Sequence, residues 1–119
     1  MTPEEKTVHH LWRWMGEGRW DQIAELFSEN AKIYWPNTEE AFDVSTYIRI
    51  NQHYPGTWLL TEMDIQTCDR DVVSVVKIEG ENAVLFAISF FTFKAGKIIT
   101  IREYFAENTP IPDWRKKDQ

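Results

Sequence analysis

Cysteine is almost absent from this sequence of 119 residues: Cys68 stands alone, so no disulfide can form within the chain. Basic residues are also scarce, since 13 Lys and Arg stand against 19 Asp and Glu and give a net charge of −6. This deficit argues against a nucleic acid or an anionic membrane as partner, because both attract basic patches. The longest apolar stretch, 83–93, is about half the length that spans a bilayer. Residues 2–5 lack the pattern of a signal peptide, so we expect a cytoplasmic protein.

What the sequence does have is a large apolar and aromatic content. Hydrophobic residues make up 43% of it and aromatic residues 14%, which is too much for a disordered acidic chain. The length fits one domain that buries about two-thirds of its unfolded surface. We therefore expect residues 1–119 to form a single domain, with an extended tail from about residue 108, where Pro110 and Pro112 remove backbone donors.

Three helices are predicted in the first half of the chain. The first begins with a capping box of Thr2 and Glu5 and ends at Gly16 and Gly18. Asp43 is one candidate to cap the third helix, and Ser45 is the other. Each helix has one apolar face at the helical period. These faces consist of Val8, Leu11, Trp12 and Met15; of Trp20, Ile23, Ala24 and Phe27; and of Val44, Tyr47, Ile48 and Tyr54.

From Thr57 onward the apolar period changes to two, which predicts strands. In the first of them we expect Leu59, Met63 and Ile65 on the buried side. Further strands are predicted over 72–79, 83–93 and 97–107, and a short one over 32–35. Short turns between consecutive strands predict an antiparallel meander, and helices followed by strands predict an α+β fold with the helices on one face of the sheet.

The last two strands are apolar on both faces. In the strand over 83–93, the side chains on one face are Ala87, Ser89 and Phe91. Those on the other face are Phe86, Ile88 and Phe90. An antiparallel sheet with one wet face alternates more cleanly than this. We therefore expect a homodimer that covers the outer face of the sheet. Trp114 in the tail is expected to rest on its own subunit or on the partner.

Two segments carry a resemblance to a known family. The segment 26–37 reads LFSENAKIYWPN, and the segment 96–105 reads GKIITIREYF. Together with the order of elements they resemble the NTF2-like superfamily, in particular its SnoaL-like branch. The resemblance implies a cone in which three N-terminal helices pack on a strongly curved antiparallel sheet and enclose a pocket. The superfamily includes polyketide cyclases, ketosteroid isomerases, epoxide hydrolases and pocket proteins without catalysis, so the resemblance does not settle the function.

The catalytic groups of two of these enzyme classes are missing here. The resemblance aligns the isomerase base Asp with Trp35, the oxyanion-hole Tyr with Leu11, and the donor Asp with Ser89. None of these three residues exchanges a proton as a carboxylate does, which argues against a ketosteroid isomerase. Epoxide hydrolases of this fold need an Arg and an Asp on a strand that here reads VVSVV over 72–76, so their water-activating triad is missing as well.

Glu103 is the candidate catalytic residue. It interrupts the otherwise apolar series Ile101, Glu103, Phe105, so its carboxyl is expected to be desolvated, with a raised pKa suited to acid–base work. The alternative is an ion pair with Arg13 or Arg49 that only joins helix to sheet.

A pairing of Phe93 with Lys97 across the last hairpin would set Ser89 opposite Ile101. Ser89 would then be a diagonal neighbour of Glu103. The predicted ligand-binding residues are Trp35, Asn37, Ser89, Ile101, Phe91, Phe105, Tyr34 and Trp14, whereas Trp12, Trp20 and Trp58 are expected to fill the core.

No metal site is predicted, because the three histidines do not form a ligand motif with other residues. No phosphate loop or dinucleotide fingerprint is present, so no cofactor is expected. The predicted function is binding of a small apolar or aromatic molecule, with cofactor-independent acid–base chemistry by Glu103: isomerisation, cyclisation, dehydration or hydrolysis. The alternative is a non-catalytic carrier, sensor or dimerisation module with a vestigial cavity.

Overall fold

Helix α1 (Pro3–Glu17) is defined at both ends by local hydrogen bonds in the computed structural model, which describes residues 1–119. The Thr2 hydroxyl accepts from the backbone of Glu5 at 3.0 Å, and the Glu5 carboxylate accepts from the backbone of Thr2 at 2.9 Å. Gly18 ends the helix with a left-handed φ of 71° and donates to the last carbonyls. The predicted capping box is confirmed.

All three predicted helices are present, but the second is too short to form a layer with the others. Helix α2 (Trp20–Ala24) has five residues, so only α1 and α3 (Val44–Gln52) are substantial. Phe27 does not continue α2 but begins the first strand, because backbone hydrogen bonds around Glu25 and Leu26 close the helix. Asp43 caps α3 by accepting from the backbone of Thr46 at 2.8 Å. Tyr54 lies beyond α3 and is 48% exposed, so it is not part of the buried helix face.

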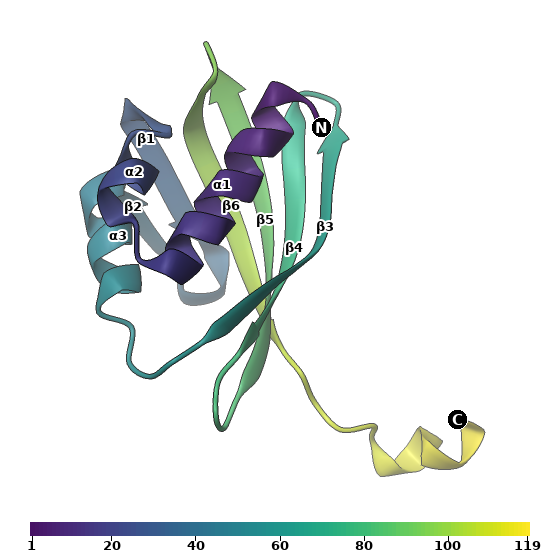
Figure 1. Ribbon diagram of the computed structural model, residues 1–119. Coiled ribbons are helices and arrows are strands. Elements are labelled where there is room, and N and C mark those ends of the chain that lie inside the picture. The colour runs from purple at the N-terminus through teal and green to yellow at the C-terminus, as the bar shows by residue number, and fades with distance from the viewer.

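Six strands form one sheet in the order β2-β1-β6-β5-β4-β3. Their bounds are β1 Phe27–Trp35, β2 Glu40–Asp43, β3 Leu59–Cys68, β4 Asp71–Glu79, β5 Val84–Lys94 and β6 Lys97–Glu107. Strand β1 runs parallel to β6, whereas all other neighbours are antiparallel. The sheet is therefore mixed, which corrects the predicted antiparallel sheet. It is also not strongly curled into the expected cone (Figure 1).

A bulge near the start of β6 changes the predicted register. Thr92 pairs with Thr100 but Phe93 pairs with Ile98, so Ile99 is the extra residue. The hairpin also pairs Phe93 with Ile98 and not with Lys97 as expected, and the two shifts together place Ser89 directly opposite Glu103 and not opposite Ile101. This direct pairing brings the two side chains together on the inner face.

A second bulge interrupts β3 between Glu62 and Asp64, where Met63 is the extra residue. The alternation reverses there, and Met63 is 58% exposed instead of buried. Leu59 is also on the outside, at 63% exposed, while Ile65 packs against the core. The predicted alternation was thus right for Ile65 and wrong for Leu59 and Met63.

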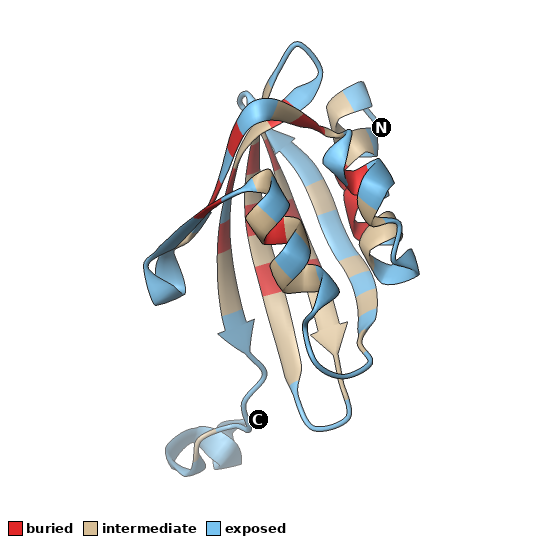
Figure 2. Ribbon diagram, turned by 90° about the vertical axis from the view of Figure 1, so that its left-hand side faces the viewer, coloured by how far each residue is buried: buried red, intermediate tan, exposed pale blue.

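The core lies between the helices and the inner face of the sheet, and Figure 2 shows the buried residues concentrated there. Helix α1 packs on β3 and β4, and α3 packs on β1 and β2. In β5 the buried residues Ala87, Ser89 and Phe91 alternate with partly exposed ones, as the sequence indicated. All three helices lie on one side of the sheet, and its other face is uncovered (Figure 1).

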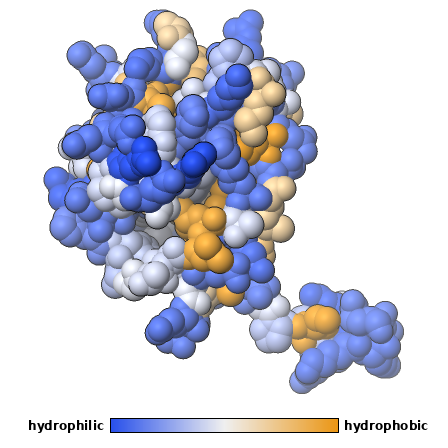
Figure 3. All heavy atoms as spheres, viewed as in Figure 1, coloured by the Kyte–Doolittle hydropathy of each residue, from blue (hydrophilic) through white to orange (hydrophobic).

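The tail leaves the body after β6 and extends away from it (Figures 1 and 3). Residues 113–118 form a 3-10 helix, η2 (Asp113–Asp118), where an extended segment was expected. Pro112 is the N-cap residue: its carbonyl accepts from the backbone of Arg115 at 3.2 Å, and its missing N–H is not needed at that position, so the prolines do not prevent the helix. Trp114 is 73% exposed and does not anchor the tail to its own subunit. None of the helices is both long enough and apolar enough to cross a membrane.

Candidate functional site

A cavity of about 620 Å³ lies between the ends of α1 and α3 and the adjoining half of the sheet. Eleven of its lining residues are hydrophobic. Strands β3 to β6 line it with residues inside the strands, whereas β1 and β2 each line it with a terminal residue, Trp35 and Glu40. The lining consists of Trp12, Met15, Gly16, Glu17, Gly18, Trp20, Trp35, Thr38, Glu40, Tyr47, Asn51, Gln52, Tyr54, Gly56, Trp58, Leu60, Ile78, Leu85, Glu103 and Phe105. The walls are thus mostly aromatic and aliphatic, with a few polar groups between them.

Glu103 is the buried polar group of this cavity. It is 2% exposed, and each of its carboxyl oxygens has one hydrogen-bond donor. The indole N–H of Trp35 donates to Oε1 at 3.0 Å, and the hydroxyl of Ser89 donates to Oε2 at 2.5 Å. Neither Arg13 nor Arg49 pairs with it, since Arg13 contacts Glu17 and Arg49 contacts Thr46. The alternative of a helix-to-sheet ion pair is therefore wrong.

Burial raises the pKa of the Glu103 carboxyl above its ordinary value. The hydrogen bonds from Ser89 and Trp35 favour the ionised form and oppose this effect, but desolvation outweighs them. Each carboxyl oxygen has a further lone pair besides the one used by its donor. Glu103 can thus accept a hydrogen bond from a molecule in the cavity, or donate one while it is protonated.

Tyr47 supplies a second ionisable group at the cavity wall. It comes from α3 and is 1% exposed, and its ring packs edge-on against Phe27 and Trp35. Burial, and secondarily the negative charge of Glu103, raise the pKa of its hydroxyl well above the ordinary range. The hydroxyl is therefore a neutral hydrogen-bond donor next to an acidic group.

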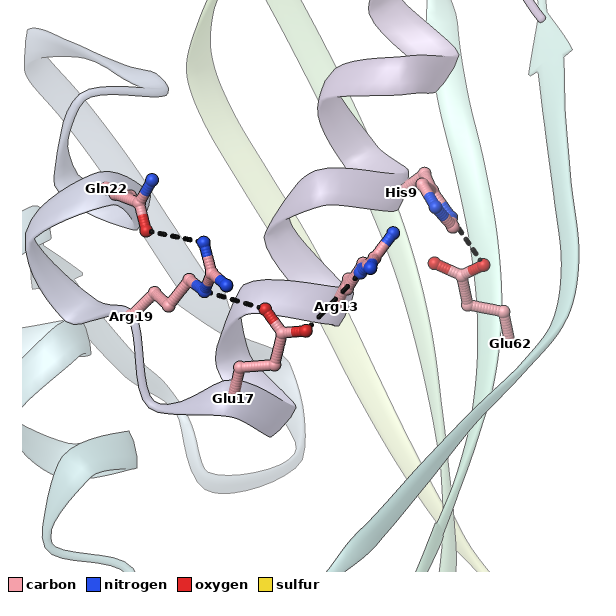
Figure 4. Close-up of polar contacts among 6 residues, drawn as sticks. All are labelled: His9, Arg13, Glu17, Arg19, Gln22 and Glu62. Carbon is pink, nitrogen blue, oxygen red and sulfur yellow. Dashed lines mark hydrogen bonds and ion pairs between the residues drawn. The ribbon is translucent and has the colours of Figure 1, made fainter.

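The C-terminal end of α1 forms one edge of the cavity. Here Glu17 accepts from Arg19 at 2.8 Å and from Arg13 at 3.4 Å, so its charge is met by two cations (Figure 4). On the opposite edge, the indole N–H of Trp58 donates to the carbonyl of Pro55 at 2.7 Å. The ring of Trp58 packs on Gly80, where a Cβ atom would lie only 2.7 Å from it.

Another polar contact lies outside the cavity, between α1 and β3. His9 Nδ1 is 2.7 Å from Glu62 Oε2, and the other carboxyl oxygen of Glu62 is buried without a partner (Figure 4). Glu62 faces inward because it precedes the bulge of β3. This pair joins helix to sheet and is not part of the cavity wall.

The predicted site residues are placed at different depths. Trp35, Glu103 and Phe105 line the cavity, and Ser89 lies behind it, in contact with Glu103. Ile101 and Phe91 are fully buried in the core.

Three others lie away from the cavity wall. Tyr34 is 42% exposed, on the face of β1 opposite to that of Trp35. Trp14 stacks on His10 with a centroid distance of 4.8 Å. Asn37 accepts from the backbone of Phe105 at 2.8 Å and so fixes the turn η1 (Pro36–Thr38) against β6.

The sequence analysis missed the aromatic residues that make up most of the wall. Trp12 is buried in the core as expected and Trp20 packs against it, but these two and Trp58 also line the cavity, together with Tyr47 and Tyr54. A signal was present in part: Trp20 and Trp58 each follow a glycine by two residues, at turns where the backbone leaves a helix. The indole of Trp12 also donates to Ser74 at 3.0 Å, which ties its edge to the sheet.

No protein-family model and no curated protein matches this sequence, but solved structures resemble it. A protein from Kribbella flavida DSM 17836, described as a candidate ketosteroid isomerase, superposes with a TM-score of 0.85 at 21% identity, over 97% of this chain and 86% of that chain. An NTF-2 like protein of unknown function from Burkholderia xenovorans LB400 gives 0.84 at 18% identity, over 97% and 91%. A candidate SnoaL-like polyketide cyclase from Jannaschia sp. CCS1 gives 0.76 at 15%, over 87% and 85%. At these identities the likeness establishes the architecture, and the chain therefore has the NTF2-like fold.

Proposed function

We propose that the protein binds a small, largely apolar molecule in the cavity, with Glu103 as the polar group that anchors it. The observation that carries this proposal is a buried carboxyl at the wall of a cavity whose other residues are mostly apolar. Sites for small molecules have volumes of roughly 300–1,000 Å³ and a few convergent polar groups among apolar walls. A cavity of about 620 Å³ has room for a ligand of two or more fused rings.

Acid–base chemistry is the reactivity that Glu103 would supply. A carboxyl with a raised pKa exchanges protons closer to neutral pH than an exposed one does. The two positions that the family resemblance aligns with isomerase acids carry Trp35 and Ser89, and both donate to Glu103. The acidic group would thus act from β6, so we propose an isomerisation, cyclisation, dehydration or hydrolysis other than ketosteroid isomerisation. A carrier without turnover would use the same pocket.

Binding is tested with two neutral probes of similar shape, 2-acetylnaphthalene and 2-ethylnaphthalene. Four of the six tryptophans line the cavity, so both probes are expected to change the tryptophan emission and to raise the unfolding temperature. Leu85→Trp fills the cavity and is expected to weaken both probes by at least roughly ten-fold. Leu59→Trp, on the exposed side of β3, is the matched control. Equal binding by the wild type and Leu85→Trp would contradict the proposed site.

The role of Glu103 is read from the difference between the two probes. At a pH near 4.5, where the raised pKa keeps Glu103 protonated, Glu103→Leu is expected to weaken the ketone, relative to the hydrocarbon, by roughly ten-fold, because the ketone oxygen loses the carboxyl O–H that donates to it. The hydrocarbon serves as the internal control for folding and cavity shape. An unchanged ratio would remove Glu103 as the anchor while leaving the cavity as the binding site.

We also propose that the protein is a homodimer joined through the outer face of the sheet. Phe86, Ile88, Phe90 and Tyr104 lie on that face and are only half-buried in a single chain. A second copy would cover these side chains. It would also cover Trp114 and Ile111 of the tail, which are exposed in a single chain. Two-fold symmetric dimers are the commonest assemblies of soluble chains.

A further inference from the structure

The charged residues that line the cavity are all acidic. They are Glu17, Glu40 and Glu103, and no Lys, Arg or His belongs to the lining. Glu17 is neutralised from outside by Arg13 and Arg19 (Figure 4). The acidic groups of the lining that no cation neutralises are therefore Glu40 and Glu103, in a protein whose net charge is also negative.

The other two glutamates have no cation beside them. Glu40 accepts from the hydroxyl of Thr38 at 2.6 Å, and Glu103 accepts from a neutral indole and a neutral hydroxyl. None of the ion pairs in the structure involves either residue. A carboxylate without a cationic partner near an apolar wall is a favourable neighbour for a bound cation.

The walls between these carboxyls are rich in aromatic rings. Seven aromatic side chains line the cavity: Trp12, Trp20, Trp35, Tyr47, Tyr54, Trp58 and Phe105. The face of an aromatic ring attracts a cation, most strongly for tryptophan, and several rings together are the usual recognition site for an ammonium group.

The protein's own cations do not use these rings. Arg102 lies over Phe90 and Tyr104 on the outer face of the sheet, and Arg115 lies over Trp114 in the tail. The cation–π contacts within the chain thus lie outside the cavity, and no cation of the protein occupies its rings.

We infer that the molecule bound in the cavity is an organic cation: an amine or quaternary ammonium carried on an apolar body. The ammonium group would contact the aromatic rings, Glu40 and Glu103, and a cation beside Glu103 favours its ionised form against the effect of burial. The apolar body would pack on Leu60, Ile78 and Leu85 of the sheet. This inference rests on the proposed binding function and names the class of its ligand. An anionic ligand is disfavoured, because it would meet Glu40 and Glu103, which have no cation beside them, and no basic group in the lining.

The test uses three naphthalene compounds of nearly equal size, measured by calorimetric titration. They are the cation (2-naphthylmethyl)trimethylammonium, its neutral isostere 2-neopentylnaphthalene, and the anion 2-naphthylacetate. The quaternary cation has no N–H, so it reports charge and not hydrogen bonding. We expect it to bind at least as tightly as the isostere despite its stronger hydration, and at least roughly ten-fold more tightly than the anion.

Variants then separate the cavity charges from the overall charge. Glu103→Gln and Glu40→Gln are each expected to weaken the cation by roughly three- to ten-fold and to leave the isostere unchanged. Glu40 is exposed, so its variant stays informative if Glu103→Gln folds poorly. Glu107→Gln, an exposed glutamate of β6 outside the lining, changes the net charge equally and is the matched control.

Two outcomes would overturn the inference in distinguishable ways. If the isostere binds while the cation binds at least ten-fold more weakly, the cation inference fails and small-molecule binding stands. If none of the three compounds binds, the proposed binding function fails together with it.

Discussion

The carboxyl of Glu103 is held by neutral groups alone. Trp35 and Ser89 donate to it, and Tyr47 lies near enough to feel its charge, but no basic side chain compensates its ionisation. Desolvation therefore raises its pKa. The folded protein keeps a proton on Glu103 at pH values where the unfolded chain, with an ordinary value near 4.5, has lost it. The resulting stabilisation is complete below the unfolded pKa and is lost as pH rises through the folded one.

Replacement of this carboxyl by an amide should remove that pH dependence. In Glu103→Gln the side chain cannot ionise, so we expect the stability of the variant relative to the wild type to increase as pH rises from about 4.5 through the raised pKa, and to level off above it. Urea unfolding across this range measures the difference. Glu107→Gln controls for the loss of one negative charge. A relative stability that instead decreases over the same range would contradict the raised pKa.

At the level of residues the sequence revealed the acid but not its surroundings. Glu103 stood out because it interrupts an apolar face, and Trp35 and Phe105 followed from the family resemblance. Trp12 and Trp20 were not predicted as wall residues, because a helical apolar stripe looks the same whether it fills a core or borders a cavity. Trp12 shows this: its indole edge binds Ser74 in the core while the residue also lines the cavity.

The elements were easier to predict than their pairing. Helix α1 and strands β3 to β6 follow from hydrophobic period and turn residues, because those signals are local. The parallel contact of β1 with β6 joins residues about 70 positions apart, such as Ile33 and Ile101, and no local pattern marks it. No local sequence pattern marks the bulges at Met63 and Ile99 either, since one inserted residue does not alter the apolar character of a strand.

The bulge of β3 gives a direct test of the side-chain directions. Met63→Gln is expected to change the free energy of unfolding by no more than about 0.5 kcal/mol, because this side chain is exposed. Ile65→Gln places an amide against the core and is expected to cost about 1–3 kcal/mol. Urea unfolding of both variants checks the pair. Equal losses at the two positions would mean that β3 alternates without a bulge.

Taken as a whole, the molecule covers one face of its sheet and leaves the other to be covered. The helices lie on the inner side (Figure 1). The outer side carries Phe86, Ile88 and Phe90 of β5, and Phe90 pairs with Val73 of β4 and with Arg102 of β6. Figure 3 shows the helix side as mostly hydrophilic, with hydrophobic patches between the hydrophilic residues. Dimerisation through the outer face would bury Phe86, Ile88 and Phe90 without closing the cavity.

A charge placed in the middle of the outer face should separate the proposed dimer. Ile88 lies in β5, flanked by β4 and β6, and Ile88→Lys would require two lysines to be buried across a two-fold interface. We expect the wild type to sediment as a dimer, and this variant to dissociate with a dissociation constant at least roughly ten-fold higher. Gln22→Lys, on the exposed helix side, adds the same charge and should leave the dimer intact. A wild type that sediments as a monomer, or an Ile88→Lys variant as dimeric as Gln22→Lys, would show that the outer face is not the interface.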